Sequence, residues 1–269
     1  MLQLYRLALS IHVLAGITGL AAFWTPAIAR KGGQTHVQIG RIFYNATCVI
    51  ALTGLAMAAM ITVAPTPGRP RILAFFLVYL VIITFAPVYH GVRVLETRAE
   101  PARLRSPFHT ALNTAAIVAA AGMIALAFLA HQPVFAALSP IGVLVGRGNL
   151  RFARMPYASR MSWWYEHMGS MLAGGIAFHT AFLVIGAGRV LAAHLTGVTA
   201  VIPWVLPSMV GIPATQIWIA YYRRKFECRD APASAGTRSR AGYGEASPKP
   251  LRGEGGGSVM RDPIQGFSD

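Results

Sequence analysis

The sequence predicts an all-α protein built as a polytopic membrane helix bundle. Of its 269 residues, 55% are hydrophobic and only 12% are charged, about half the charged fraction of a typical soluble domain. Several apolar runs are longer than the roughly 18 residues that identify a candidate membrane-spanning helix. These runs are continuous instead of alternating, which excludes a transmembrane β-barrel.

Seven apolar segments are expected to form the helices. They cover residues 5–27, 41–64, 72–93, 108–130, 132–146, 164–188 and 199–221. The fifth is short and carries Pro140, so a re-entrant segment is the alternative to a full span. The seventh carries three prolines and is therefore expected to be kinked or broken.

The positions of Lys and Arg predict the orientation. With seven spans and the N-terminus outside, twenty of the 24 Lys and Arg residues lie on the inner side or in the tail, and four lie outside. Without the fifth span, the basic clusters at 30–41 and 93–105 would lie opposite the cluster at 147–160. The sequence therefore predicts seven spans, with the N-terminus outside and the C-terminus inside.

The net charge of +15 does not indicate a nucleic-acid partner. The arginines stand in short clusters between apolar runs, as in loops that face lipid headgroups. The expected partner is the lipid bilayer, with no nucleic acid. Residues 1–228 are expected to form the transmembrane bundle, and residues 229–269 a disordered cytoplasmic tail, because that segment lacks apolar periodicity.

Histidine is the only ionisable residue type expected inside the spans, where such groups are costly and indicate function. With about 1.5 Å of rise per residue, His12 and His179 lie at similar depths, roughly 6 Å and 1–2 Å to the outer side of the midplane. His90, His109 and His167 lie about 12–16 Å to the inner side. His36 is expected in the first inner loop.

The two outer histidines are predicted to hold a haem. The glycines expected to share a helical face with them are Gly16, Gly19, Gly175 and Gly186. A macrocycle bound by histidines needs faces without bulky side chains, so His12 and His179 are expected to face each other across roughly 10–13 Å. The alternative is that the glycines allow close helix packing and the histidines only form hydrogen bonds.

The inner histidines predict a second haem site, drawn from His90, His109 and His167. Glu166 follows the aromatic run 163–165, which is typical of a membrane interface. Two roles are open for Glu166. It forms an ion pair with the basic loop at 147–160, or it accepts a hydrogen bond that fixes a histidine tautomer.

Three stretches carry a resemblance to a known family: HVLAG at 12–16, HVQIGRIFY at 36–44 and EHMGSMLAGGIAFHTAFLV at 166–184. Together they resemble a bacterial domain-of-unknown-function family of uncharacterised multi-pass membrane proteins, over roughly residues 5–190. The resemblance implies a place in the bacterial inner membrane and no established activity. The histidines are also similar, by pattern alone, to those of b-type membrane cytochromes of the b561 group.

The leading hypothesis is an electron carrier that binds b-type haem between paired histidines. A small-molecule transporter or a sensor without redox chemistry is the alternative, and a structural role stays open. A metal-dependent hydrolase ranks last, because no H-x-x-x-H or H-E-x-x-H cluster is present.

Overall fold

The computed structural model is an all-α bundle, which confirms the predicted fold class. It describes residues 1–66, 68–131, 133–155, 160–188, 194–195, 199 and 202–227. The elements in this part of the chain are α1 (Leu2–Ile28), α2 (Gln34–Val63), α3 (Arg71–Glu96), η1 (Pro101–Leu104), α4 (Pro107–Ala130), α5 (Pro133–Arg154), α6 (Ser162–Ala181), the π-turn η2 (Phe182–Gly186) and α8 (Ile202–Glu227).

Six of the described helices are long and apolar enough to cross a membrane, which makes this a multi-pass membrane protein. The helix that falls short is α5, because its last turns carry polar and basic side chains, among them Asn149, Arg151 and Arg154. α5 nevertheless runs for 22 residues without a break at Pro140. The predicted end at residue 146 is therefore wrong, whereas the full span and the re-entrant segment both stay predictions.

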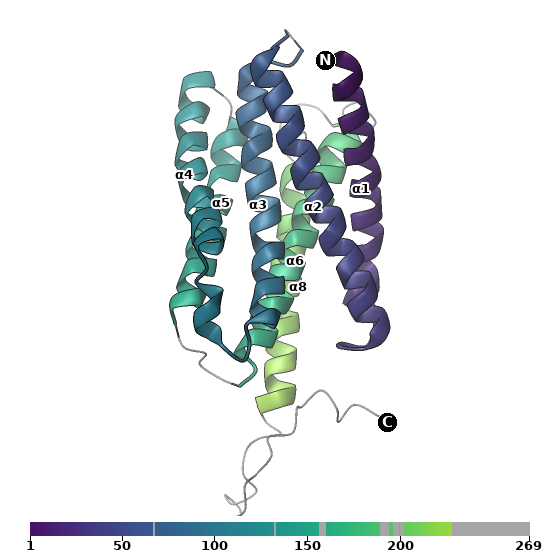
Figure 1. The fold of residues 1–269 in the computed structure, drawn as a ribbon, viewed down its shortest axis with the longest axis vertical. Helices are drawn as coiled ribbons and strands as arrows, with labels where there is room; N and C mark the ends of the chain where they lie inside the picture. Colours follow the sequence, from purple (N-terminus) through teal and green to yellow (C-terminus); the bar gives the residue numbers. More distant parts are fainter. Residues whose placement is uncertain are drawn as a thin grey trace, which may run out of the picture. The chain divides into compact units, whose positions relative to one another are not determined.

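α3 lies in the middle of the bundle, with α4 and α5 on one side and α1 and α2 on the other (Figure 1). Val94, Leu104 and Ala153 form one apolar cluster, so the end of α3, the turn η1 and the end of α5 meet. The starts of α2 and α6 lie at the same end, where the rings of His36 and His167 are neighbours.

We call this end of the bundle the basic end, because it gathers the basic segments 30–41, 93–105 and 147–154. The prediction of seven helices requires this arrangement. α4 begins at the basic end, and α5 must bring the chain back to it. Which side of the membrane the basic end faces stays a prediction.

Two helix predictions need correction. α2 begins at Gln34 instead of residue 41, so His36 lies in its first turn and not in a loop. α8 is one continuous helix that contains Pro207 and Pro213, so it is not broken, and the expected kink stays a prediction. The chain divides into one unit that ends at Ala220 and a second that begins at Tyr221. The tail predicted at 229–269 lies outside the described residues.

Small residues let α4 and α5 approach closely. Gly142 and Gly146 stand one helical turn apart on α5. A Cβ added to Gly146 would lie 2.4 Å from the carbonyl oxygen of Asn113, and one added to Gly142 would lie 2.6 Å from that of Ala116. Such small-xxx-small pairs are how membrane helices pack without a hydrophobic driving force between them.

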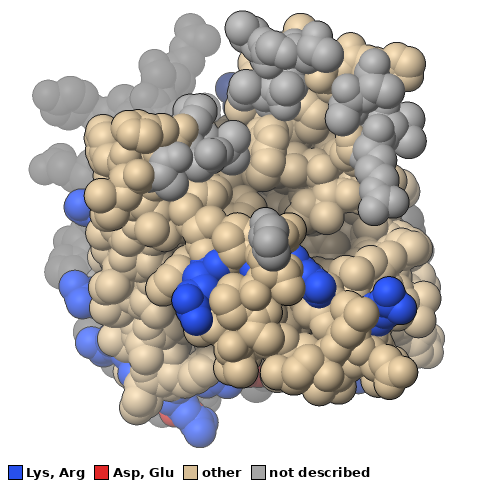
Figure 2. Space-filling view, turned by 90° about the horizontal axis from the view of Figure 1, so that it is seen from above, with Lys and Arg blue, Asp and Glu red and all other residues tan. Residues whose placement is uncertain are grey.

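The sides of the bundle carry large apolar side chains, as a lipid-facing surface does. Leu14, Leu52 and Leu144 are each about two thirds exposed or more. Figure 2 looks onto the end of the bundle that Figure 1 draws at the top, where Lys and Arg form scattered groups and Asp and Glu hardly show. Exposed apolar sides with charges gathered at helix ends suit a protein embedded in a bilayer.

Candidate functional site

A buried row of titratable groups joins α6, α3 and α4 near the basic end. His90 Nε2 lies 3.0 Å from the Glu166 Oε1 atom, and His90 Nδ1 lies 2.9 Å from His109 Nε2. Both histidines are fully buried, whereas the Glu166 side chain is 30% exposed. Of the two roles open for Glu166, the hydrogen bond to a histidine is present in the structure.

This row continues into buried amides and ends on one unpaired atom. The Asn113 amide donates to the His109 carbonyl oxygen at 2.8 Å, and the Asn149 amide donates to Asn113 Oδ1, also at 2.8 Å. Among the described residues, His109 Nδ1 is buried and has no hydrogen-bond partner. A buried polar atom without a partner costs free energy, so this nitrogen calls for an explanation.

His36 and His167 form a second pair, on α2 and α6. His36 Nδ1 lies 3.1 Å from the Pro26 carbonyl oxygen, and His167 Nδ1 lies 3.0 Å from that of Gly91. A carbonyl oxygen only accepts, so both Nδ1 atoms carry the proton in the neutral rings and both Nε2 atoms keep a free lone pair. The ring centres are 6.5 Å apart.

A half-buried cation lies beside this pair. Lys31, in the turn between α1 and α2, donates to the carbonyl oxygens of Pro26 and Ala27 at 2.8 Å and 2.6 Å. Its ammonium lies 5.0 Å from the ring centre of Trp218. Burial lowers the pKa of Lys31 from its ordinary value. Lys31 is close enough for its charge to act on both His36 and His167.

The structure does not bring His12 and His179 together, so their predicted pairing is wrong. His12 Nδ1 bonds the Thr53 hydroxyl on α2 at 2.9 Å. The His179 ring instead lies against Phe23 and Trp24, with ring centres 5.5 Å and 5.4 Å away. Those aromatic residues follow His12 by eleven and twelve positions on α1, roughly 16–18 Å of helix rise.

The glycines near these two histidines also do not line a common gap. A Cβ on Gly16 would meet no atom within 4 Å, whereas one on Gly19 would meet the Phe178 ring at 2.3 Å. A Cβ on Gly175 would lie 2.0 Å from the Phe23 ring. Gly19 and Gly175 therefore make room for aromatic side chains of the facing helix. This agrees with the alternative in which the glycines allow close helix packing. Gly186 lies in η2, against Phe182 of the same turn.

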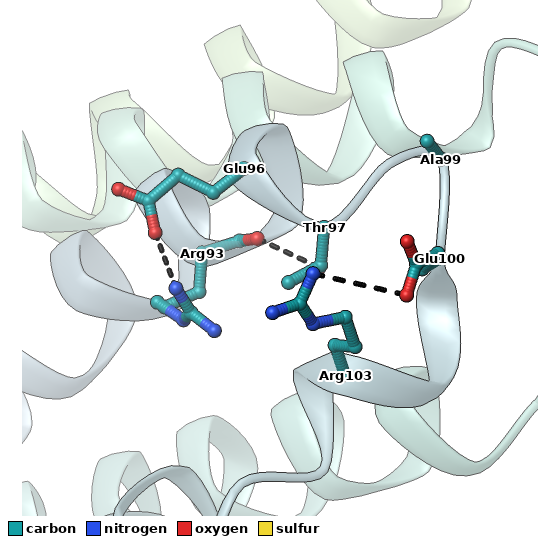
Figure 3. A pocket seen from close by; sticks show the side chains of 6 residues that line it. All are labelled: Arg93, Glu96, Thr97, Ala99, Glu100 and Arg103. Carbon is teal, nitrogen blue, oxygen red and sulfur yellow. Dashed lines mark hydrogen bonds and ion pairs between the residues drawn. The ribbon is translucent and has the colours of Figure 1, made fainter.

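A hollow of about 180 Å³ opens beside the end of α3 (Figure 3). It is lined by Arg93, Glu96, Thr97, Ala99, Glu100 and Arg103. Arg93 pairs with Glu96, and Arg103 lies 3.8 Å from Glu100. The charges neutralise one another within the wall, so the hollow has no unbalanced charge to attract an ionic ligand.

The inner layer of histidines is thus close to what the sequence predicts, with a different pairing. His90, His109 and His167 lie near the basic end as expected, and His36 joins them. The sequence does not identify His36 as a site residue, because the polar start of α2 has the composition of a loop. Its spacing of four from Gly40, within HVQIG, is the signal that could have found it. Among the described residues, no group of three or more His, Cys, Asp or Glu could hold a metal ion.

Comparisons with known proteins add no relative. No protein-family model, no curated protein and no solved structure matches this chain. The two histidine clusters are therefore the features of this chain that point to a function.

Proposed function

We propose that this chain is a membrane electron carrier of the bacterial inner membrane that binds one b-type haem between His36 and His167. The observation that carries the proposal is the geometry of this pair, in which two neutral imidazoles with free Nε2 atoms have ring centres 6.5 Å apart. The pair replaces His12 and His179 as the axial ligands.

The spacing suits two ligands on opposite sides of one iron. A ligating imidazole nitrogen lies about 2 Å from its metal and about 1.1 Å from its own ring centre, so trans ligands have ring centres roughly 6 Å apart. The spacing of roughly 10–13 Å expected for His12 and His179 is therefore too long for two ligands of one iron. By contrast, the nitrogens that His90 and His109 turn to each other are only 2.9 Å apart. Two nitrogens on opposite sides of one iron need roughly 4 Å.

The number of ligands also favours a haem over a bare metal ion. A protein site for a bare transition metal needs three or four side-chain donors, and the described residues offer no such group. A haem iron needs only the two axial donors, because the porphyrin supplies the other four. Two histidines on separate helices are therefore a complete protein ligand set.

The surroundings of the pair suit a flat, anionic cofactor. A Cβ on Gly40, one turn after His36 on α2, would meet no atom within 4 Å, so the face beside that ring is open. Lys31 lies near both rings; Arg30 precedes it in the same turn, and Arg41 follows Gly40 on α2. Haem propionates are anionic, and cations at this depth stabilise them.

The residues of this chain would hold and tune the cofactor, which supplies the one-electron chemistry when bound. The hydrogen bonds from Nδ1 to the Pro26 and Gly91 carbonyls fix the tautomer and the orientation of each ring. They also raise the basicity of each Nε2, which strengthens it as a ligand.

The proposal is tested by the haem content and the reduced spectrum of protein purified from haem-replete cells. We expect about one haem per chain with the spectrum of a six-coordinate b-type cytochrome. His36→Ala and His167→Ala should each lose most of the haem while the protein still inserts. A colourless wild-type protein would overturn the proposal and would leave a transporter, a sensor or a structural role standing.

A further inference from the structure

We infer that the hollow at the end of α3 binds the headgroup of a zwitterionic phospholipid whose cation is a primary ammonium, as in phosphatidylethanolamine. The phosphate contacts the arginines of the wall, and the ammonium contacts its carboxylates. An acyl chain of the same lipid lies against aromatic side chains of α3 and α4. The proposed haem ligands take no part, so the inference is independent of the proposed function.

The wall of the hollow carries two positive and two negative side chains. Arg93 and Arg103 supply the guanidinium groups, and Glu96 and Glu100 supply the carboxylates. Figure 3 shows both guanidinium groups between the end of α3 and η1. A ligand with a single charge is attracted by one pair and repelled by the other, whereas a zwitterion is attracted by both pairs.

These side chains can form hydrogen bonds beyond their own ion pairs. A guanidinium has five N–H donors, so Arg93 has donors left beside its contact with Glu96. Arg103 Nη1 lies 3.8 Å from Glu100 Oε2, which is too long for a hydrogen bond. The Arg103 and Glu100 side chains are 72% and 68% exposed, so a ligand can reach both. A phosphate accepts paired bonds from arginine, and a primary ammonium donates three.

The negative groups favour a primary ammonium over a quaternary one. Glu96 is the last residue of α3, and the C-terminus of a helix carries a partial negative charge that adds to the carboxylates. A quaternary ammonium such as choline has no N–H donor, so it cannot form hydrogen bonds with Glu96 or Glu100. The hollow of about 180 Å³ has the volume of about six water molecules, which suits a small headgroup.

The hollow lies at the height where lipid headgroups are expected. Trp163 packs on the apolar cluster that contains Val94 and Leu104, from the two elements that form the wall. The guanidinium of Arg98 lies 5.2 Å from the ring centre of Trp163. Tryptophan at the end of a membrane helix is typical of the headgroup level.

An aromatic stripe, formed by Phe85, Tyr89 and Phe108, leads from the hollow toward the middle of the bundle. Phe85 and Tyr89 precede Arg93 by two turns and one turn on α3, so they share its helical face. The rings of Phe85 and Tyr89 have centres 5.7 Å apart, and the Phe108 ring lies 5.1 Å from that of Tyr89. Phe108 is 56% exposed, and the other two are half-buried. The stripe covers roughly 12 Å of helix rise, along which an acyl chain can pack.

The test measures lipid binding by native mass spectrometry of the full chain in detergent micelles. The probes are phosphatidylethanolamine, phosphatidylcholine and phosphatidylglycerol with identical acyl chains. We expect phosphatidylethanolamine to bind about tenfold more tightly than the other two, because one charge-assisted hydrogen bond accounts for that ratio. Soluble phosphoethanolamine at the same concentration should not displace it, since it has no chain to contact the stripe. Equal binding of the three lipids, or displacement by phosphoethanolamine, would overturn the inference.

Glu96→Gln combined with Glu100→Gln is the decisive variant, because it leaves two positive groups in the wall. The order should then reverse, with phosphatidylglycerol bound more tightly than phosphatidylethanolamine. Arg103→Gln should weaken phosphatidylethanolamine about tenfold, whereas the control Arg151→Gln, at the basic end of α5, should not change its binding. Phe108→Ala should weaken phosphatidylethanolamine and phosphatidylcholine by the same factor. A preference for phosphatidylethanolamine that survives the loss of both carboxylates, or of Arg103, would show that its headgroup does not bind in the hollow.

Discussion

His167 Nδ1 bonds the carbonyl oxygen of Gly91 at 3.0 Å, across the interface between α6 and α3. The contact depends on how closely the two helices approach. A Cβ on Gly91 would lie 2.6 Å from Met171 and 2.9 Å from the Cβ of Ser170. The absence of a side chain at Gly91 therefore allows the bond that orients a proposed ligand.

Gly91→Ala should push α6 away from α3 and weaken this bond. We expect a loss of about 1–3 kcal/mol in stability from overpacking, together with a lower haem occupancy. Gly122→Ala on α4 is the matched control, since a Cβ there meets nothing within 4 Å. Haem content and thermal unfolding of both variants provide the check. Equal occupancy in the two would show that the Gly91 approach does not govern the site.

Two glycines on one helix test the packing of α5 on α4. Gly146→Ala puts a Cβ 2.4 Å from a backbone oxygen that cannot turn away, so it should destabilise the protein by about 1–3 kcal/mol. Gly148→Ala has open space and should be neutral or stabilise by up to about 1 kcal/mol, because alanine is the better helix former. Unfolding measured in the same detergent distinguishes them, and similar values for both would contradict the close α4–α5 contact.

The outer histidines should be dispensable for the cofactor. His12→Ala loses its hydrogen bond to Thr53, and His179→Ala loses its contacts with Phe23 and Trp24. Each change should cost about 0.6–2 kcal/mol of stability, the range for polar contacts between membrane helices. Neither should change the haem spectrum. Loss of haem in either variant would restore the outer pair as ligands.

The orientation can be read from reporter fusions. A reporter joined after Arg229 should lie in the cytoplasm and one at Met1 outside, because the basic end of the bundle is expected on the inner side. A C-terminal reporter exposed on the outer side would invert the topology, although the bundle itself would stand.

The sequence predicts most helices well because six of those described are long apolar runs, which composition identifies, whereas the polar end of α5 hides its length. It also predicts the inner layer of histidines, since depth follows from counting residues to a helix end. The His12–His179 pairing fails because α1 and α6 are offset along the bundle, so equal distances from the two helix midpoints do not mean equal heights. The side chain of His179 in addition leans toward the start of α6, as helical side chains do.

The bonds inside the site lie beyond what sequence patterns can predict. Glu166 pairs with His90, 76 positions away, only because α3 and α6 pack at that height. The sequence does not place His36 in a helix because the start of α2 is polar. Gln34, Thr35 and Gln38 surround His36, and no apolar periodicity identifies this segment as helical.

The most direct test of the central claim is the low-temperature electron paramagnetic resonance spectrum of the oxidised protein. Two histidine ligands from His36 and His167 predict a six-coordinate, low-spin ferric haem. His36→Ala should convert any haem that remains to a five-coordinate, high-spin form, whereas His12→Ala should keep the low-spin signal. A low-spin signal that survives in both His36→Ala and His167→Ala, or a wild-type protein without haem, would contradict the account.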